Sequence, residues 1–208
     1  APQQAKKFSK EWNQLHAGRL PAHMTDLATG GGIYQDMADS ERNALVHASV
    51  EIINRRVSLA VVMSCNTKEV DALAPRWIAG FSNAYSVCCH LAMMRAADWL
   101  RDNGRPEKIA YVYEAANKYQ GETNQFITHV QAELGPRGMD PYSYRSHTFT
   151  PKEDFAPLQA ADLWAWEWTK FYDETHMRHL RPPRHSLRSL ILSQPGRYFG
   201  NHVTGAPL

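Results

Sequence analysis

One carboxylate in this sequence lies inside an apolar segment with the character of a helix. Asp162 belongs to the stretch 158–166, in which no basic residue stands within four positions on either side of it. An unpaired buried charge costs several kcal/mol, so Asp162 needs a partner from elsewhere: a metal ion, an arginine or a cluster of backbone N–H groups. Asp98 is the contrast, because Arg95 and Arg101 lie three residues to either side of it. Asp162 is therefore a candidate functional residue, whereas an ordinary ion pair explains Asp98.

Other candidates stand where α/β proteins place functional groups. Glu114 ends a predicted strand, 109–113, and ligands gather beyond the carboxyl ends of strands in such sheets. A solvated strand end is the alternative. His23 lies in a loop beside Asp26, where it could donate to that carboxylate or bind a metal ion. A histidine without a functional role is the alternative there.

Several common catalytic motifs are absent. The glycine-rich stretch 29–33 lacks the Gly-Lys-Ser/Thr ending of a phosphate-binding loop, and no dinucleotide-binding glycine pattern follows a strand. No Gly-x-Ser-x-Gly nucleophile motif occurs. His176, His179 and His185 are too loosely spaced to indicate a metal site.

The elements that must position the candidates alternate between helix and strand. Apolar spacing and stop signals predict strands at 57–63, 109–113 and 144–149, and a loop at 20–32. The predicted helices cover 6–17, 40–53, 76–103, 122–134, 158–175 and 187–192. This alternation predicts an α/β domain with a central sheet, although three strands are few for a chain of this size. Strands 57–63 and 109–113 are nearly all apolar, so each is expected to have neighbours on both sides.

Length and composition are those of a globular protein. The chain has 208 residues, 43% of them apolar and 21% charged, and its net charge of +2 is too small to indicate a partner. Three cysteines form no disulfide or zinc-binding pattern. No apolar run could span a bilayer and no signal pattern is evident, so we expect a cytoplasmic protein without membrane association.

Charge is unevenly distributed, and the last residues are strongly basic. Residues 176–208 contain no Asp or Glu but five arginines and four histidines. Such an end could bind nucleic acid through its phosphates, or it could be a solvated tail. We therefore expect one domain, 1–175, followed by a basic C-terminal extension, 176–208.

Taken together, four strings are similar to the ordered landmarks of one known family. They are residues 8–12, 23–27, 109–114 and 157–163, and the last string is the most specific. The chain thereby resembles the domain of unknown function 3800 family, which is widespread in bacteria and phages and is thought to share the RNase H-like fold. The family's opening strand carries an Asp-Glu-Ser motif that nothing here matches. The resemblance therefore implies an α/β fold with an RNase H-like central sheet flanked by helices and lacking its opening strands. Truncation, a late start of the sequence record or true loss would each explain that departure.

The resemblance also implies a chemistry. RNase H-like nucleases hold two divalent ions, Mg²⁺ or Mn²⁺, between carboxylates, and one ion activates water. By position, Glu114 and Asp162 would be metal ligands, and His23 and Asp26 would lie at the same catalytic rim. Without the carboxylate of the opening strand, the chain is expected to bind Mg²⁺ poorly and to cleave little.

Three functions remain open from sequence. The first is a metal-dependent nuclease, or nuclease-like hydrolase, whose substrate is not indicated. The second is a catalytically silent RNase H-like binding module. In the third, another chain, including a second copy of this one, completes the sheet by donating a strand.

Overall fold

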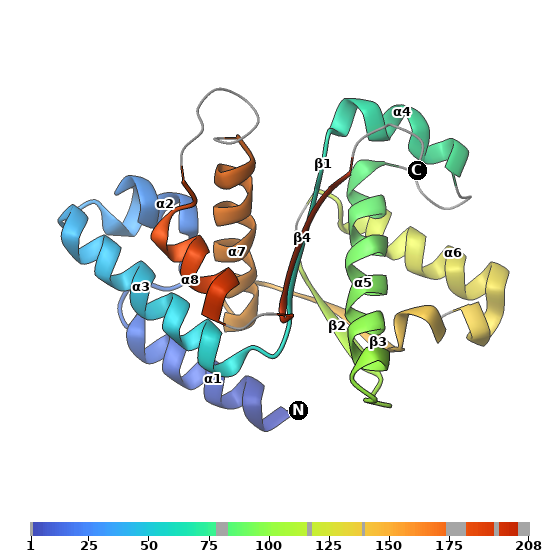
Figure 1. Ribbon diagram of the computed structural model, residues 1–208, viewed down its shortest axis with the longest axis horizontal. Coiled ribbons are helices and arrows are strands. Elements are labelled where there is room, and N and C mark those ends of the chain that lie inside the picture. Colours follow the sequence, from blue (N-terminus) through green and yellow to red (C-terminus); the bar gives the residue numbers. More distant parts are fainter. Residues whose placement is uncertain are drawn as a thin grey trace. The chain divides into compact units, whose positions relative to one another are not determined.

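The computed structural model describes residues 2–77, 83–115, 118–138, 140–173, 182–193 and 196–203 (Figure 1). The chain forms two compact units, each described here by itself. The helical unit comprises Ala1–Ala60 and Pro151–Phe199, and the sheet unit comprises Val61–Thr150 and Gly200–Leu208. Helices and strands alternate along the chain, so the predicted α/β class is confirmed.

The helical unit is a cluster of helices from both ends of the chain. It contains α1 (Pro2–Leu15), α2 (Met24–Thr29), the 3-10 turn η1 (Gly32–Tyr34), α3 (Asp39–Arg56), α7 (Ala156–Asp173) and α8 (His185–Ser193). Helices α1, α2 and α8 each pack against both α3 and α7. The buried side chains at these contacts include Trp12, Leu27, Ile53, Leu163 and Leu187. Residues from both ends of the chain therefore share one core.

Ring stacking within α1 and ion pairs between α1 and α3 stabilise this part of the helical unit. Phe8 and Trp12 lie one turn apart on α1 and stack with ring centroids 5.3 Å apart. Glu11, on the same helix, pairs with Arg55 and Arg56 at the end of α3. Hydrogen bonds from Arg56 and then Arg55 lower the pKa of Glu11 to about 2. These ion pairs join the two helices at their surface.

Two pairs of strands lie in the sheet unit, apart from Ala60 and residues 198–199 at the ends of two of the strands, which fall in the helical unit. The elements of the sheet unit are β1 (Ala60–Cys65), α4 (Thr67–Trp77), α5 (Ala84–Asp102), β2 (Ile109–Glu114), α6 (Gln120–Gly138), the 3-10 turn η2 (Asp140–Tyr142), β3 (Tyr144–Thr150) and β4 (Tyr198–Val203). Strands β2 and β3 pair in parallel, with Glu114 opposite Thr150. Strand β1 pairs with β4. The bonds from Ala60 N to Arg197 O and from Asn66 N to Val203 O advance in the same order, so this pair is parallel too.

Tyrosine side chains of β2 pack against α5 and η2, and their hydroxyls form hydrogen bonds there. The Tyr111 hydroxyl donates to the Tyr142 carbonyl at 2.6 Å, and the Tyr113 hydroxyl donates to the Met93 sulfur at 3.1 Å. Met93 and Tyr142 belong to a buried cluster with Val87, Phe126 and Ile127. Burial raises the pKa values of both Tyr111 and Tyr113, so their hydroxyls stay protonated donors.

Most of the predicted elements are present, with shifted ends. Strands 109–113 and 144–149 are confirmed as β2 and β3, and helices 158–175 and 187–192 correspond to α7 and α8. The strand predicted at 57–63 begins only at Ala60, because α3 continues to Arg56 and the Val57 N–H still bonds to the Ile53 carbonyl. The strand 198–203 was missed.

Other predictions were wrong. The predicted loop 20–32 contains α2, and the helix predicted over 76–103 corresponds to the end of α4 and to α5, with residues 78–82 outside the described part. Helix α5 begins at Ala84 because the Asn83 side chain accepts a hydrogen bond from the Ser86 N–H. Helix α6 continues through residues 135 and 136, where a stop was predicted.

The strands also pair less extensively than predicted. Each strand in the described part of the chain has one hydrogen-bonded neighbour, whereas neighbours on both sides were expected for 57–63 and 109–113. Strand β1 is mostly half-buried, and Ala110 and Glu114 of β2 are exposed. The apolar residues of these strands therefore pack against helices such as α5 on one face, and the strands are not buried on both faces.

The basic end is partly packed. Leu187 and Leu190 of α8 are fully buried against the helical unit, while Arg188 on the same helix is exposed. A solvated tail therefore does not describe residues 185–193. His176 and His179 lie outside the described residues. No helix among the residues that the structure describes is long and apolar enough to cross a membrane.

Candidate functional site

The partner of Asp162 comes from the start of α2. One oxygen of the Asp162 carboxylate, Oδ2, accepts a hydrogen bond from the Met24 backbone N–H at 2.9 Å. The same oxygen lies 3.9 Å from Nδ1 of His23. The sequence allowed a metal ion, an arginine or backbone N–H groups as the partner of Asp162. In the structure the partner is a backbone N–H, and the His23 imidazole lies nearby. Asp162 remains 34% exposed at its side chain, so it is half-buried and open to solvent on one side.

This contact caps α2 from a distant helix. The residue before the first turn, His23, makes no capping hydrogen bond with its own side chain. Asp162 supplies the acceptor instead, and its negative charge faces the positive end of the helix dipole. A helix of six residues is too short to be stable alone, which explains why its sequence resembled a loop.

Gln159 holds the segment just before α2 in the same way. It lies one turn before Asp162 on α7, and its Oε1 accepts hydrogen bonds from the Ala22 backbone N–H and from Trp12 Nε1, both at 2.9 Å. Its Nε2 donates to the Lys152 carbonyl at 2.8 Å. Gln159 and Asp162 thus bind the chain on either side of His23. Sequence reasoning missed Gln159, although a polar amide within the same apolar string as Asp162 was a usable signal.

His23 faces Asp162 with a nitrogen that lacks a hydrogen bond. Its Nδ1 is buried and has no hydrogen-bond partner among the described residues, although the side chain as a whole is half-exposed. A separation of 3.9 Å is too long for a hydrogen bond but short enough for electrostatic attraction if the ring carries a proton. The pair could therefore exchange a proton, or share a cation or a water molecule, between an imidazole and a carboxylate.

The Asp26 side chain lies close to the turn after α2. A Cβ atom built at Gly32, where φ is +52°, would stand 2.8 Å from Oδ2 of Asp26, so the turn requires glycine at that position. Burial, with a smaller contribution from Asp26, raises the pKa of Tyr34 to about 12, against the opposing effect of Arg19. No hydrogen bond or ion pair joins Asp26 to His23 in the described part of the chain. The carboxylate opposite His23 is therefore that of Asp162.

Glu114 belongs to the other unit. It ends β2 as predicted, is exposed, and stands opposite Thr150, and the next residue, Ala115, donates its N–H to the Thr150 carbonyl at 3.0 Å. Asp162 lies in the helical unit and Glu114 in the sheet unit, and the two units are described separately. The predicted approach of the two carboxylates stays a prediction.

A divalent metal ion at Asp162 would need several oxygen ligands. No group of three or more His, Cys, Asp or Glu side chains suited to a metal ion occurs among the described residues. Asp162 offers oxygen, which Mg²⁺ prefers, but one of its oxygens already binds the Met24 N–H. An ion held by Asp162 would therefore need further oxygen ligands.

The chain matches no protein-family model, no curated protein sequence and no solved structure. By its fold, the chain is a mixed α/β protein. In its candidate site the Asp162 carboxylate of α7 caps α2 beside His23.

Proposed function

We propose that this protein is a nuclease or nuclease-like hydrolase of the RNase H-like type, related to the domain of unknown function 3800 family. Asp162 is the helix carboxylate of the proposed site and Glu114 the strand-end carboxylate. The observation that carries the proposal is the meeting of Asp162 with His23. Two residues selected from sequence as chemical candidates, far apart along the chain, lie 3.9 Å apart at a half-exposed site.

In this proposal the residues of the chain orient the ligands of the reaction and transfer protons. The Met24 N–H fixes one Asp162 oxygen and leaves the other for a ligand. His23 can accept a proton from water or donate one to a phosphate oxygen. A bound Mg²⁺ or Mn²⁺, held by Asp162 and Glu114, would lower the pKa of a water molecule and offset charge on the phosphate.

The test is cleavage of labelled single-stranded DNA, duplex DNA, RNA and an RNA–DNA hybrid in Mg²⁺ or Mn²⁺, with and without EDTA. We expect slow cleavage that EDTA abolishes, and a loss of at least about 100-fold in Asp162→Asn and in Glu114→Gln. The matched control is Asp98→Asn, because Asp98 lies in a similar apolar helix but pairs with Arg101. Unchanged cleavage in Asp162→Asn, or no cleavage of any substrate, would contradict the proposal.

A second candidate is a silent module whose sheet another chain completes. It is favoured by the sheets themselves, since each described sheet has two strands and such pairs are marginal alone. The Ala115 N–H points toward β3, so by alternation the Val112 N–H points to the other edge of β2. Val112→Pro should therefore abolish strand addition while keeping the bonds between β2 and β3. Sedimentation of the wild type as a monomer at all concentrations would contradict self-association through this edge.

A further inference from the structure

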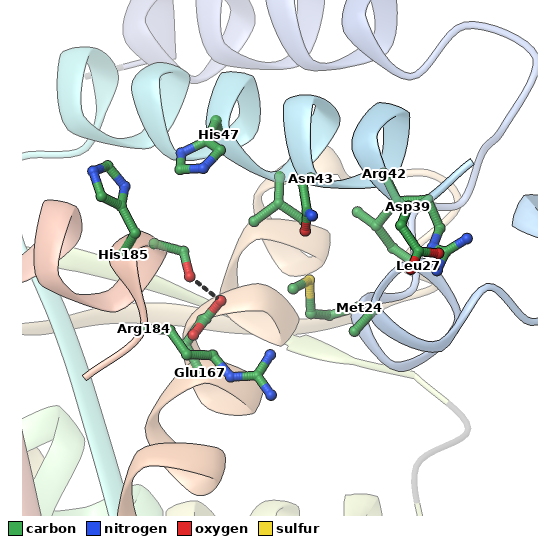
Figure 2. A pocket seen from close by; sticks show the side chains of 12 residues that line it. Met24, Leu27, Asp39, Arg42, Asn43, His47, Glu167, Arg184 and His185 are labelled. Carbon is green, nitrogen blue, oxygen red and sulfur yellow. Dashed lines mark hydrogen bonds and ion pairs between the residues drawn. The ribbon is translucent and has the colours of Figure 1, made fainter. Parts of the chain in front are cut away.

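A cavity lies in the helical unit, between α2, α3, α7 and the start of α8 (Figure 2). Its volume is about 370 Å³, which suits a small ligand. The Met24 side chain lines it, whereas the Met24 backbone N–H faces Asp162. Neither His23 nor Asp162 is among the lining residues, so the cavity is separate from the site described above.

Three exposed side chains with nitrogen donors line the cavity. Arg184, His185 and His47 are exposed and line it together. The guanidinium of Arg184 lies over the Trp166 ring, 4.7 Å from its centroid, and the rings of His47 and His185 meet edge to face at 4.8 Å. These contacts orient the side chains before any ligand arrives.

Two acidic residues also line the cavity, and each is engaged. Asp39 pairs with Arg42 at 2.5 Å, and its own side chain is 88% exposed, so solvent screens its charge. Glu167 is only 1% exposed and accepts a hydrogen bond from the Ser186 hydroxyl at 2.5 Å (Figure 2). The Ser186 hydroxyl thus links one oxygen of this carboxylate to the start of α8. Arg184, His47 and His185 are the exposed lining residues that carry hydrogen-bond donors on a cation or an imidazole.

Apolar side chains also line the cavity, beside Asp39 and Arg42 (Figure 2). Met24 and Leu27 of α2 are buried residues that face the cavity, and Val46 of α3 adds to them. A ligand that fits both kinds of side chain combines an anionic group with a less polar body. Arginine binds phosphate through two parallel N–H groups, and a phosphate monoester has three acceptor oxygens where a carboxylate has two.

We infer that this cavity binds the phosphate monoester of an organic molecule, with Arg184 and the His47–His185 pair on the phosphate and the α2 side chains against the organic part. The phosphate can come from a free nucleotide-sized molecule or from the end of a nucleic-acid strand. This inference does not depend on the proposed nuclease activity.

The test is calorimetric titration of the full chain with adenosine 5′-monophosphate, adenosine and inorganic phosphate. We expect the monophosphate to bind more tightly than either part alone. Arg184→Ala should weaken its binding by about tenfold or more, and Arg184→Lys by less, because lysine lacks the planar fork. Arg188→Ala is the matched control: it removes the same charge from the exposed side of α8, outside the cavity lining, and should leave binding unchanged.

Two oligonucleotides, with a 5′-phosphate and with a 5′-hydroxyl, distinguish the sources. Tighter binding of the phosphorylated strand than of the monophosphate would assign the cavity to strand ends, and the reverse would assign it to free nucleotides. Melting curves verify that each variant is folded. No binding of any phosphate, equal binding of adenosine and its monophosphate, or equal losses in Arg184→Ala and Arg188→Ala would overturn the inference.

Discussion

The Asp162 carboxylate accepts a hydrogen bond from the backbone N–H of Met24, 138 residues earlier in the chain, at 2.9 Å. The contact ties the middle of α7 to the first turn of α2 and places His23 beside the carboxylate. Structural and chemical roles thus meet in one side chain. Substitutions must therefore separate the charge of Asp162 from its capacity to accept a hydrogen bond.

Asp162→Ala should destabilise α2 directly. Removing the acceptor leaves the Met24 N–H without its cap, and loss of a helix cap costs about 0.5–2 kcal/mol. Asp162→Asn keeps an acceptor oxygen, so it should lose less stability while losing the charge. Urea unfolding of the two variants, with amide exchange at Met24, measures the difference. Equal stability of Asp162→Ala and the wild type would mean that α2 does not depend on this cap.

Gln159→Leu should lower the stability of the protein strongly, although glutamine and leucine side chains are similar in size. The substitution leaves two donors, Trp12 Nε1 and the Ala22 N–H, without their acceptor in a buried place. Each buried donor left without a partner costs about 1–3 kcal/mol, so we expect a loss of about 2–6 kcal/mol in the free energy of unfolding. Gln14→Leu, on the exposed side of α1, is the control and should change stability little. Similar losses in the two variants would contradict the role of Gln159.

Stability should fall as the pH drops from about 6.5 towards 4, in part because of His16. Burial lowers the pKa of His16 from 6.5 to about 4, and the residue is only 1% exposed. Over this interval the unfolded chain binds a proton that the folded chain does not, so the stabilisation is complete above pH 6.5 and is lost on acidification. The loss is about 3 kcal/mol at most.

Urea unfolding of the wild type and of His16→Gln at pH 7.5 and pH 5 tests this contribution. His16→Gln should show the smaller dependence on pH, with the remainder coming in part from His90 and His147, whose pKa values burial also lowers. An unchanged dependence in His16→Gln would show that His16 titrates normally in the folded protein.

The packing of α8 predicts a contrast between two leucines on the same helix. Leu190 is fully buried and Leu192 is 60% exposed. Leu190→Ala should therefore cost about 2–5 kcal/mol, through lost burial and the cavity left behind, and Leu192→Ala close to nothing. Thermal melting compares them. Similar melting temperatures would mean that this basic segment contributes no core packing.

The amino-acid sequence by itself determined the class of the fold and the need that Asp162 has for a distant partner. Both follow from local quantities: the alternation of helix and strand patterns, and the absence of a basic residue within one turn of Asp162 compared with Asp98. The positions of β2, β3, α7 and α8 followed from the same local patterns.

Only the tertiary structure decided which groups meet Asp162. Helix α2 has six residues, too few for a helical periodicity to be recognised in the sequence. Its first N–H has a hydrogen-bond acceptor only because α7 packs beside it. For the same reason Gln159, ordinary in sequence, becomes the acceptor for two buried donors, and His23 turns towards Asp162 although Asp26 is nearer in sequence. Contacts between residues far apart in the chain depend on how helices pack, and local sequence patterns do not encode that packing.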